Sequence, residues 1–238
     1  MRAAIFGANG GIGRALCQEL LNNSAIQIVY AIARSETHAD HDARIVPVQV
    51  DFTDDKLLAR AADQIGQVGM LDLVIVASGV LSDGETIRPE KTYRDQSIDA
   101  FEQVFAANTF GPAMVAKHFL PMLRRQSPSK FAVLSARVGS ITDNRLGGWH
   151  AYRASKAALN MLVKNYALEL ARRNDQAVCV SLHPGTVATR LSAPFTSGGN
   201  RELFKPELAA RQLLDVLSKL DAASSGKHFD WGGLEIPA

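Results

Sequence analysis

Two residues in the second half of the chain, Tyr152 and Lys156, have the chemistry of an acid/base pair. They occur in YRASKAALNML, a segment of helical period, so a spacing of four places both side chains on one helix face, about one turn apart. A phenol with a pKa of about 10 exchanges protons poorly at neutral pH, and a neighbouring ammonium stabilises the phenolate. The pair is therefore a candidate proton donor and acceptor, although Tyr-x-x-x-Lys also occurs on solvated helix faces.

A glycine-rich segment, GANGGIG, follows the first strand-like run, residues 2–6. Where a strand turns into a helix, glycines let a phosphate approach the backbone because no Cβ atom blocks it, and the helix N-terminus favours an anion. The spacing GxxxGxG differs from the commoner dinucleotide fingerprint, so a glycine turn without a ligand is the alternative. The residues expected to contact a nucleotide pyrophosphate are Gly7, Asn9, Gly11, Ile12 and Gly13.

The ends of the next two predicted strands carry residues suited to the adenosine half of a dinucleotide. About 20 residues after the last glycine, where NAD-binding proteins have an acidic residue, the chain has Arg34 and Ser35. A guanidinium pairs bidentately with phosphate, which favours NADP(H), with NAD(H) as second choice; a merely solvated arginine is the alternative. Asp51, followed by Phe52, closes the third predicted strand and is expected at the adenine, although such an Asp is also a common helix cap.

A parallel sheet would bring these residues together. Short apolar runs rich in β-branched residues alternate with segments of helical period, which predicts an α/β fold with helices on both faces of the sheet. Strands are predicted at residues 2–6, 25–33, 45–50, 71–77, 130–135, 177–183 and 228–230. Helices are predicted at residues 11–21, 54–65, 98–123, 152–173 and 206–220, with a break at Gly111-Pro112. No boundary interrupts the series, so residues 1–238 are expected to form one domain.

The composition excludes several classes of protein. The 238 residues are 47% hydrophobic and 21% charged, unlike collagen-like or disordered chains. Lys plus Arg number 26 against 24 for Asp plus Glu, without basic runs, so nucleic acid is not an expected partner. Cys17 and Cys179 are too few for a disulfide framework, and we expect a cytoplasmic protein with no membrane span and no metal. His38 and His41 lie in a polar connection and are expected to be solvated rather than metal-bound.

Together, the glycine loop, Asp51, Asn108, YRASK and HPG resemble the short-chain dehydrogenase/reductase family over essentially the whole chain. The resemblance implies one Rossmann-like, doubly wound parallel sheet of about seven strands. It also implies an oxidoreductase that transfers hydride between a nicotinamide and a carbonyl or alcohol carbon. In that reaction Tyr152 is the implied acid/base, and Lys156 lowers the pKa of Tyr152 and holds the nicotinamide ribose. Asn108 is implied to support a water-linked proton path.

Other segments match or depart from the family pattern. In HPGTVAT, the residues implied to contact the nicotinamide half of the cofactor are Pro184, Gly185, Val187 and Thr189. The family's NNAG is VASG here, which loses an Asn but leaves the backbone of Ala77 and Gly79 for the cofactor. Ala136 occupies the place of the family's catalytic serine. As the replacement hydrogen-bond donor we rank Ser135 first, Ser140 second and a site without serine third.

Within the family, ARVGSITDNRLGGWHAYRASKAALNM and SGKHFDWGGLEIPA resemble the branch of C-factor (C-signal) proteins and sniffer-type carbonyl reductases. This branch implies a carbonyl reductase but does not supply its substrate. Arg34 favours NADP as the cofactor, and a small-molecule carbonyl or alcohol compound is the expected substrate. A catalytically weak nucleotide-binding signalling or sensor protein is the alternative. A lid at residues 189–205 would present apolar side chains, which suits an apolar substrate: Leu191, Phe195, Leu203 and Phe204. Because the family forms helix-bundle dimers, a homodimer or homotetramer is expected.

Overall fold

The protein is built around one eight-stranded sheet, as a computed structural model shows. The structure describes residues 1–37, 42–84, 86–193 and 203–238. The strands are β1 (Arg2–Phe6), β2 (Ile28–Ala33), β3 (Ile45–Gln49), β4 (Leu73–Val76), β5 (Ser129–Leu134), β6 (Ala177–His183), β7 (His228–Asp230) and β8 (Glu235–Ile236). Their order is β3-β2-β1-β4-β5-β6-β7-β8, and the neighbours are parallel except β7 and β8. The order reverses between β1 and β4, and sheets of this kind bind ligands at that switch point, outside the carboxyl ends of the strands.

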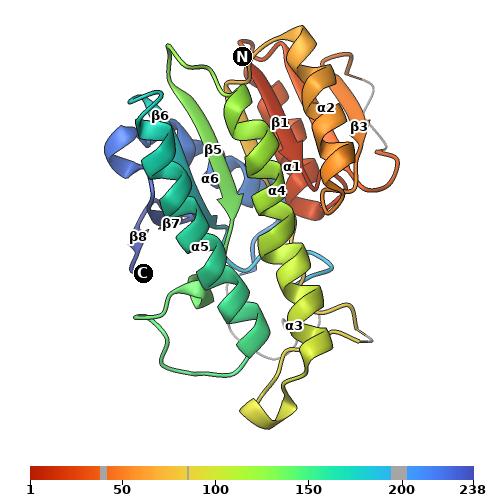
Figure 1. Ribbon diagram of the computed structural model, residues 1–238, viewed down its shortest axis with the longest axis vertical. Coiled ribbons are helices and arrows are strands. Elements are labelled where there is room, and N and C mark those ends of the chain that lie inside the picture. The colour runs from red at the N-terminus through yellow and green to blue at the C-terminus, as the bar shows by residue number, and fades with distance from the viewer. Residues whose placement is uncertain (38–41, 85, 194–202) are drawn as a thin grey trace.

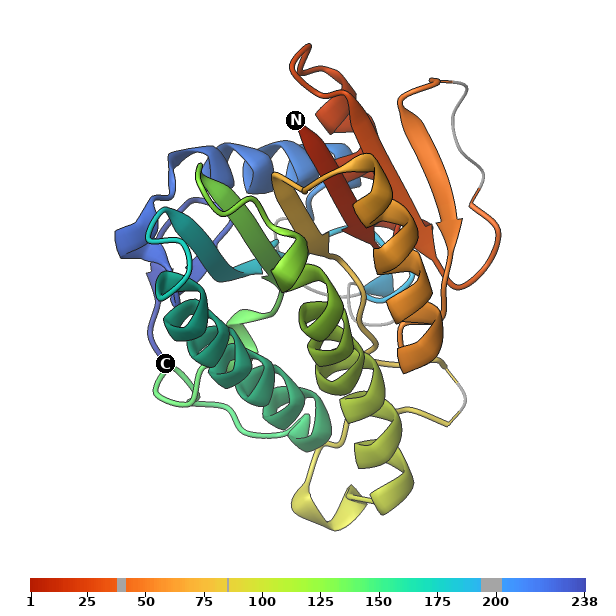
Figure 2. The ribbon, with the colours of Figure 1, turned by 45° about the horizontal axis from the view of Figure 1, so that its top comes forward.

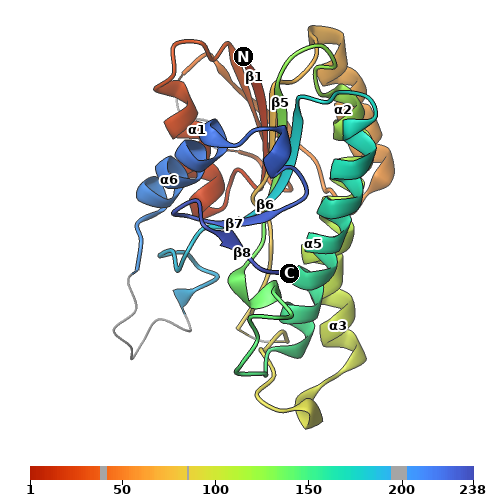
Figure 3. The same ribbon diagram turned by 90° about the vertical axis from the view of Figure 1, so that its left-hand side faces the viewer.

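Helices cover both faces of the sheet (Figure 1). They are α1 (Gly11–Leu21), α2 (Asp55–Val68), α3 (Ile98–Phe105), α4 (Gly111–Phe119), α5 (His150–Ala171) and α6 (Pro206–Lys219). The edge-on view in Figure 3 shows α1 and α6 on one face and α2 and α5 on the other. On that second face, α5 runs beside α3 and α4 across the sheet (Figure 2). The predicted α/β fold with two helical layers is therefore confirmed.

The inner strands β1, β2, β4, β5 and β6 are buried on both faces along almost their whole length, which is why they read as continuous apolar runs. Along β1, side chains alternate between the two layers: Ala4 and Phe6 pack on the α2/α4/α5 side, and Ala3 and Ile5 on the α1/α6 side. Phe6 meets the ring of Phe119 edge-on, with centroids 4.8 Å apart. Two apolar cores thus hold β1 rigidly and fix the point where the glycine loop leaves it.

Two elements differ from the sequence prediction. The short β8, antiparallel to β7, was not predicted because two residues carry no periodic signal. The single helix predicted at residues 98–123 is divided into α3, a π-helical turn (Ala106–Phe110) and α4. The backbone stays helical through this turn, so a change of helix type before Gly111-Pro112 replaces the predicted break, and Pro112 lies in the first turn of α4. Such π turns occur frequently at functional sites.

Neither a membrane-spanning helix nor a metal-binding cluster is found in the described part of the chain. None of its helices combines the length and the apolar character needed to cross a membrane. Across the same residues, no group of three or more His, Cys, Asp or Glu side chains comes together as a metal site. His38 and His41 lie outside the described residues.

The close packing of α1 against the glycine loop generates a stability prediction. A Cβ at Gly13 would lie 2.1 Å from the carbonyl oxygen of Gly7, so Gly13→Ala must displace the helix or the loop. We expect the free energy of unfolding to fall by about 1–3 kcal/mol, measured by urea titration. Gly66→Ala in α2 is the matched control, because its Cβ would meet only Met122 at 3.9 Å. The control should gain about 0.5–1 kcal/mol, and equal effects of the two variants would contradict this account.

Candidate active site

The loop between β1 and α1 is packed so closely that only glycine fits at two positions. Gly7 has a φ of +81°, and a Cβ there would lie 3.0 Å from the carbonyl carbon of Ala77, which follows β4. Gly13 lets α1 approach the loop, as described above. Within α1, which is described throughout, the first turn carries no acidic side chain. No carboxylate of that turn therefore opposes an anion at the positively polarised helix N-terminus, where a pyrophosphate is favoured.

Asn9 ties this loop to the residues after β2. Its Nδ2 donates to Oγ of Ser35 at 2.9 Å and to the carbonyl oxygen of Glu36 at 3.1 Å. Arg34 is exposed, and its carbonyl oxygen accepts a hydrogen bond from the Gln49 side chain at 3.1 Å. The Asn9 hydrogen bonds thus join the glycine loop and the end of β2 into one continuous edge, which we call the rim.

Asp51 continues this rim at the end of β3. Oδ1 of Asp51 accepts hydrogen bonds from the N–H and the hydroxyl of Thr53 at 2.9 and 2.7 Å, and these bonds, with the nearby charge of Arg34, lower the pKa of Asp51. The helix cap that was the alternative role is supplied by Asp54, whose carboxylate accepts from two N–H groups of α2. The Phe52 side chain is buried in the core, so only its backbone is available to a ligand.

A hollow of about 250 Å³ opens between the rim and α1. Its polar lining comes from Asn9, Arg14, Ser35, Glu36, Thr37 and Arg190. The hydroxyl of Thr37 is buried and has no hydrogen-bond partner in the described part of the chain, which fits a polar ligand here. The sequence reasoning did not single out Arg14 or Arg190. Arg14 could have been found as a cation in the first turn of the phosphate-binding helix, whereas Arg190 arrives from a remote segment and carries no local signal.

Tyr152 and Lys156 lie together at the start of α5 and are 8% and 3% exposed. Nζ of Lys156 lies 5.9 Å from the centre of the Tyr152 ring and donates to the carbonyl oxygen of Leu134 at 2.8 Å. Burial raises the pKa of Tyr152 to about 12 and lowers the pKa of Lys156 to about 8. Burial is the cause of the raised Tyr152 pKa, and the lowering by Lys156 that the resemblance implies stays a prediction. The phenol is protonated at neutral pH and suited to donate its proton.

Asn108 projects from the π turn between α3 and α4 and is fully buried. Its Oδ1 accepts from the N–H of Val80 at 2.7 Å, and its Nδ2 donates to the Val80 carbonyl oxygen at 2.8 Å and to Oγ of Ser155 at 3.1 Å. The hydroxyl of Thr109 donates to the Ser155 carbonyl oxygen at 2.9 Å. Asn108 therefore joins the segment after β4 to the first turns of α5, beside the acid/base pair.

The residues at the end of β5 decide which group faces Tyr152. Ala136 packs in an apolar cluster with Tyr152. Ser135 precedes it in extended backbone, where adjacent side chains point to opposite sides, and its buried hydroxyl has no partner among the described residues. Oγ of Ser140 accepts from the N–H of Asp143 at 3.0 Å within a separate turn. A methyl group, not a hydroxyl, thus lies against the phenol ring.

The N-terminus of α5 is held by Glu90, which the sequence reasoning missed. Trp149, just before the helix, has a left-handed conformation (φ 52°, ψ 44°), and its N–H donates to the Glu90 carbonyl oxygen at 2.6 Å. The Glu90 carboxylate accepts from the N–H of Ala151 at 3.2 Å and is 4% exposed. A carboxylate at a helix N-terminus is favourable. Glu90 therefore fixes the turn that carries Tyr152, and nothing in the local sequence around it signals this role.

The loop after β6 passes beside the glycine loop. It starts at Pro184, and Gly185 has a φ of +77°, where a Cβ would lie 2.7 Å from the Phe204 ring. A Cβ on Gly11 would lie 2.9 Å from Cγ2 of Thr189, so these two residues are in close contact. The structure thus brings the predicted pyrophosphate and nicotinamide loops together.

The expected lid at residues 189–205 is described only at its two ends. Val187 forms a bridge with Phe204, and Leu191 packs against the cluster around Tyr152, while Leu203 is exposed. Phe195, with the rest of residues 194–202, lies outside the described part of the chain. Both described ends of the expected lid therefore lie beside the candidate site.

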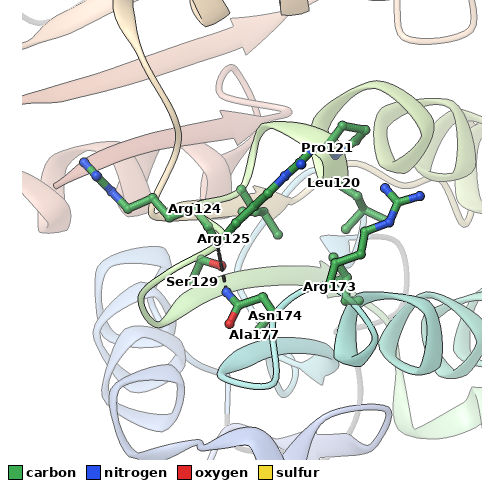
Figure 4. A pocket seen from close by; sticks show the side chains of 10 residues that line it. Leu120, Pro121, Arg124, Arg125, Ser129, Arg173, Asn174 and Ala177 are labelled. Atoms are coloured by element: carbon green, nitrogen blue, oxygen red, sulfur yellow. Dashed lines mark hydrogen bonds between the residues drawn. The ribbon is translucent and has the colours of Figure 1, made fainter.

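A second, smaller hollow lies beside the amino ends of β5 and β6 (Figure 4). Three of its polar residues bond to one another: the carbonyl oxygen of Arg124 accepts from the Ser129 hydroxyl at 3.1 Å and from the Asn174 amide at 2.8 Å. The Arg124 guanidinium pairs with Asp72. This hollow lies at the opposite ends of the strands from the Tyr–Lys pair, and its polar groups stabilise the fold.

A glycine cradle at the switch point, with a buried Tyr–Lys pair on the neighbouring helix, is the arrangement of a Rossmann-type oxidoreductase. The sequence profile of the family described as "short chain dehydrogenase" matches residues 2–199. The chain therefore belongs to the short-chain dehydrogenase family, as its motifs predict.

Individual relatives cover most or all of the chain. The C-signal protein of Myxococcus xanthus is 38% identical over 135 residues, which is 57% of this chain and 76% of that protein. A 1-hydroxy-2-glutathionyl-2-methyl-3-butene dehydrogenase of Rhodococcus is 29% identical, over 94% of this chain and 93% of that protein. An NADPH-bound carbonyl reductase from chicken fatty liver is 26% identical and superposes with a TM-score of 0.81, covering 100% and 98% of the two chains. The Drosophila carbonyl reductase Sniffer shares the fold, with a TM-score of 0.87 at 23% identity over 100% and 99% of the chains.

The buried ammonium generates a prediction on stability and pH. Because the pKa of Lys156 is about 8 in the folded protein and 10.5 for an unperturbed lysine, the unfolded chain binds more protons between these values, and stability contributed by this group rises with pH. We expect Lys156→Met to be more stable than wild type at pH 7, and its advantage to shrink by about 2–3 kcal/mol by pH 10. Urea titrations of both proteins across this range measure the difference. A constant difference would show that the Lys156 pKa is not lowered.

Proposed function

We propose that the protein is an NADP(H)-dependent carbonyl reductase that transfers hydride to small carbonyl compounds and, in reverse, oxidises the alcohols. The observation that carries this proposal is the buried Tyr152–Lys156 pair, placed at the carboxyl ends of the strands beside the glycine cradle. A protonated phenol with a cation behind it is suited to donate a proton to a carbonyl oxygen. A pure binding site has no use for such a group.

The residues of the cradle fit a dinucleotide. The pyrophosphate would lie over the N–H groups of Gly11, Ile12 and Gly13, and a bound nicotinamide would supply the hydride. Asn9, Arg34, Ser35, Asp51 and the Phe52 backbone would surround the adenosine half. The backbone of Ala77 and Gly79, with Pro184, Gly185, Val187 and Thr189, would line the nicotinamide half.

This chain's own residues would carry the proton transfer. Tyr152 donates its phenolic proton to the substrate oxygen, and Lys156 stabilises the phenolate that remains. Asn108 holds the segment after β4 against α5 and so keeps both groups in place. Ser135 would polarise the substrate carbonyl group by donating a hydrogen bond through a bridging water. We prefer it to Ser140 because the Ser135 hydroxyl is unpartnered among the described residues, whereas the Ser140 hydroxyl accepts a hydrogen bond.

The surroundings of Tyr152 favour an apolar substrate. The side chains that pack around the phenol are Leu81, Ala136, Val138, Trp149 and Leu191. An apolar wall excludes water and strengthens electrostatic interactions during hydride transfer. The dehydrogenase and carbonyl reductase relatives support a carbonyl or alcohol substrate, and the bound NADPH of the chicken enzyme supports NADP(H).

A phenylalanine in place of Tyr152 tests the acid/base assignment. Tyr152→Phe removes the proton donor while keeping the ring, so we expect carbonyl reduction to fall by at least about 100-fold with NADPH affinity unchanged. NADPH oxidation, followed by its near-ultraviolet absorbance, measures the rate, and fluorescence titration measures the affinity. Tyr166→Phe, on the same helix, is the matched control and should keep its rate. Undiminished reduction by Tyr152→Phe would refute the assignment.

Cofactor choice is tested at the rim. In wild type we expect tighter binding of NADPH than of NADH, and Arg34→Ala should weaken NADPH binding by roughly tenfold while NADH binding stays the same. Glu36→Gln, which removes a carboxylate from the lining of the hollow beside this rim, should act in the opposite direction. Equal affinity of wild type for both cofactors would overturn the preference for NADP(H).

A nucleotide-binding signalling or sensor protein with weak turnover is the second candidate. Ala136 against the phenol ring favours it, because one missing donor to the reacting oxygen costs about 3–4 kcal/mol of transition-state stabilisation. The similarity to C-signal adds support. NADPH binding without oxidation, across a panel of aldehydes, ketones and quinones, would favour this function over the reductase.

We also propose a cytoplasmic homodimer or homotetramer. Cys179 is a buried free thiol, which suits a reducing compartment. Apolar side chains on the outer helix surface, Phe110, Met161 and Leu168, are more than half exposed and are candidates for contact with a second copy.

A further inference from the structure

Polar side chains occupy the space between α5 and the carboxyl ends of β6 and β7, where a helix and a sheet normally present apolar ones. Cys179 of β6 packs in the apolar core beneath α5, and Ser181 and His183 follow on the same face because strand side chains alternate. The register pairs Ser181 with His228 and His183 with Asp230. His183 and His228 are therefore diagonal neighbours on that face.

Helix α5 contributes polar groups from its side that faces the sheet. Asn160 follows Lys156 by one turn on the stripe that begins at Tyr152, and its Nδ2 lies 3.5 Å from Nδ1 of His228. Lys156 reaches the carbonyl oxygen of Leu134 at the end of β5. The stripe of α5 that carries the acid/base pair thus continues into a polar interior.

Four buried polar atoms in this region have no hydrogen-bond partner among the described residues: Oγ of Ser135, Oδ1 of Asn160, Nδ1 of His183 and Nε2 of His228. Ser135 belongs here because its N–H donates to the carbonyl oxygen of Leu182, which places it beside His183. We call these four residues the polar layer. Native proteins normally satisfy such atoms with buried water, which both donates and accepts.

Burial keeps the two imidazoles neutral, and three charged groups face them. Arg137 after β5 and Asp230 on β7 face both rings and pair with each other at 3.1 Å, and Lys156 on α5 faces His228. Burial, with the positive charges, lowers the pKa of His183 to about 4 and that of His228 to about 3. A neutral imidazole has one donor and one acceptor nitrogen, so it can pass a proton on. Arg137 is 47% exposed and marks where this region meets solvent.

We propose that the polar layer binds ordered water, and that this water and the two imidazoles conduct protons between Lys156 and the surface beside Arg137. The proposal rests on the proposed function, in which Tyr152 gives up one proton for each carbonyl group reduced. Lys156 donates a proton to the phenolate and takes one from the bound water. Solvent then returns a proton to the bound water through the two imidazoles. Only N–H and O–H bonds are exchanged. The route is separate from the Asn108 side chain, which is bonded to Val80 and Ser155.

A crystal structure of the unliganded protein at high resolution tests the water site without any activity measurement. We expect at least one ordered water molecule hydrogen-bonded to two or more of the four unpartnered atoms. A dry layer, or side chains paired directly with one another, would overturn the proposal. This outcome is independent of the reductase assignment, which fails if wild type reduces no carbonyl compound.

Variants of His228 test proton conduction. His228→Gln keeps hydrogen-bonding groups and His228→Phe removes them, but neither side chain relays protons. Both should slow carbonyl reduction by about tenfold and enlarge the solvent deuterium isotope effect on kcat, with NADPH affinity unchanged. His118→Phe, which alters a ring paired with Asp55 of α2, is the control and should match wild type. Wild-type rates and isotope effects in both His228 variants would refute conduction through this imidazole.

Discussion

The ammonium of Lys156 lies almost out of contact with water, and its surroundings constrain the elements around it. A buried cation requires hydrogen-bond acceptors, and the Leu134 carbonyl oxygen supplies one, which joins α5 to the end of β5. That bond decides where Tyr152 stands relative to the sheet. The turn after β5 obeys the same constraint, because a Cβ on Gly139 would lie 2.8 Å from Cβ of Lys156. Moving the lysine would therefore displace a helix, a strand end and a turn together.

The features that the sequence reasoning found are those with a short-range pattern. The glycine loop and the Tyr–Lys spacing are local, and the structure places both at the carboxyl edge of the sheet. Glu90 and Arg190 reach the site from separate segments, so no spacing in the chain could reveal them. The π turn that carries Asn108 was missed because it keeps the helical period almost intact.

The end of β5 separates two chemical surroundings that the sequence could not assign. Ala136 lies among apolar side chains around the phenol, whereas Ser135, the preceding residue, enters a polar interior. One step along an extended strand is enough to make this change, because successive side chains point to opposite sides. The hydroxyl missing at Ala136 is therefore accompanied by a hydroxyl at Ser135. Polar groups are distributed differently around Tyr152 and Lys156 and are not simply lost.

The contact between Gly13 and the carbonyl of Gly7 has a consequence for how a nucleotide would be received. Because the protein's own packing holds the loop in shape, the conformational entropy of ordering it is lost when the chain folds and not when a ligand arrives. Such a preorganised cradle favours rapid association and leaves the loop almost unchanged between free and bound protein. Discrimination between cofactors then falls to the more exposed side chains at the far end of the rim.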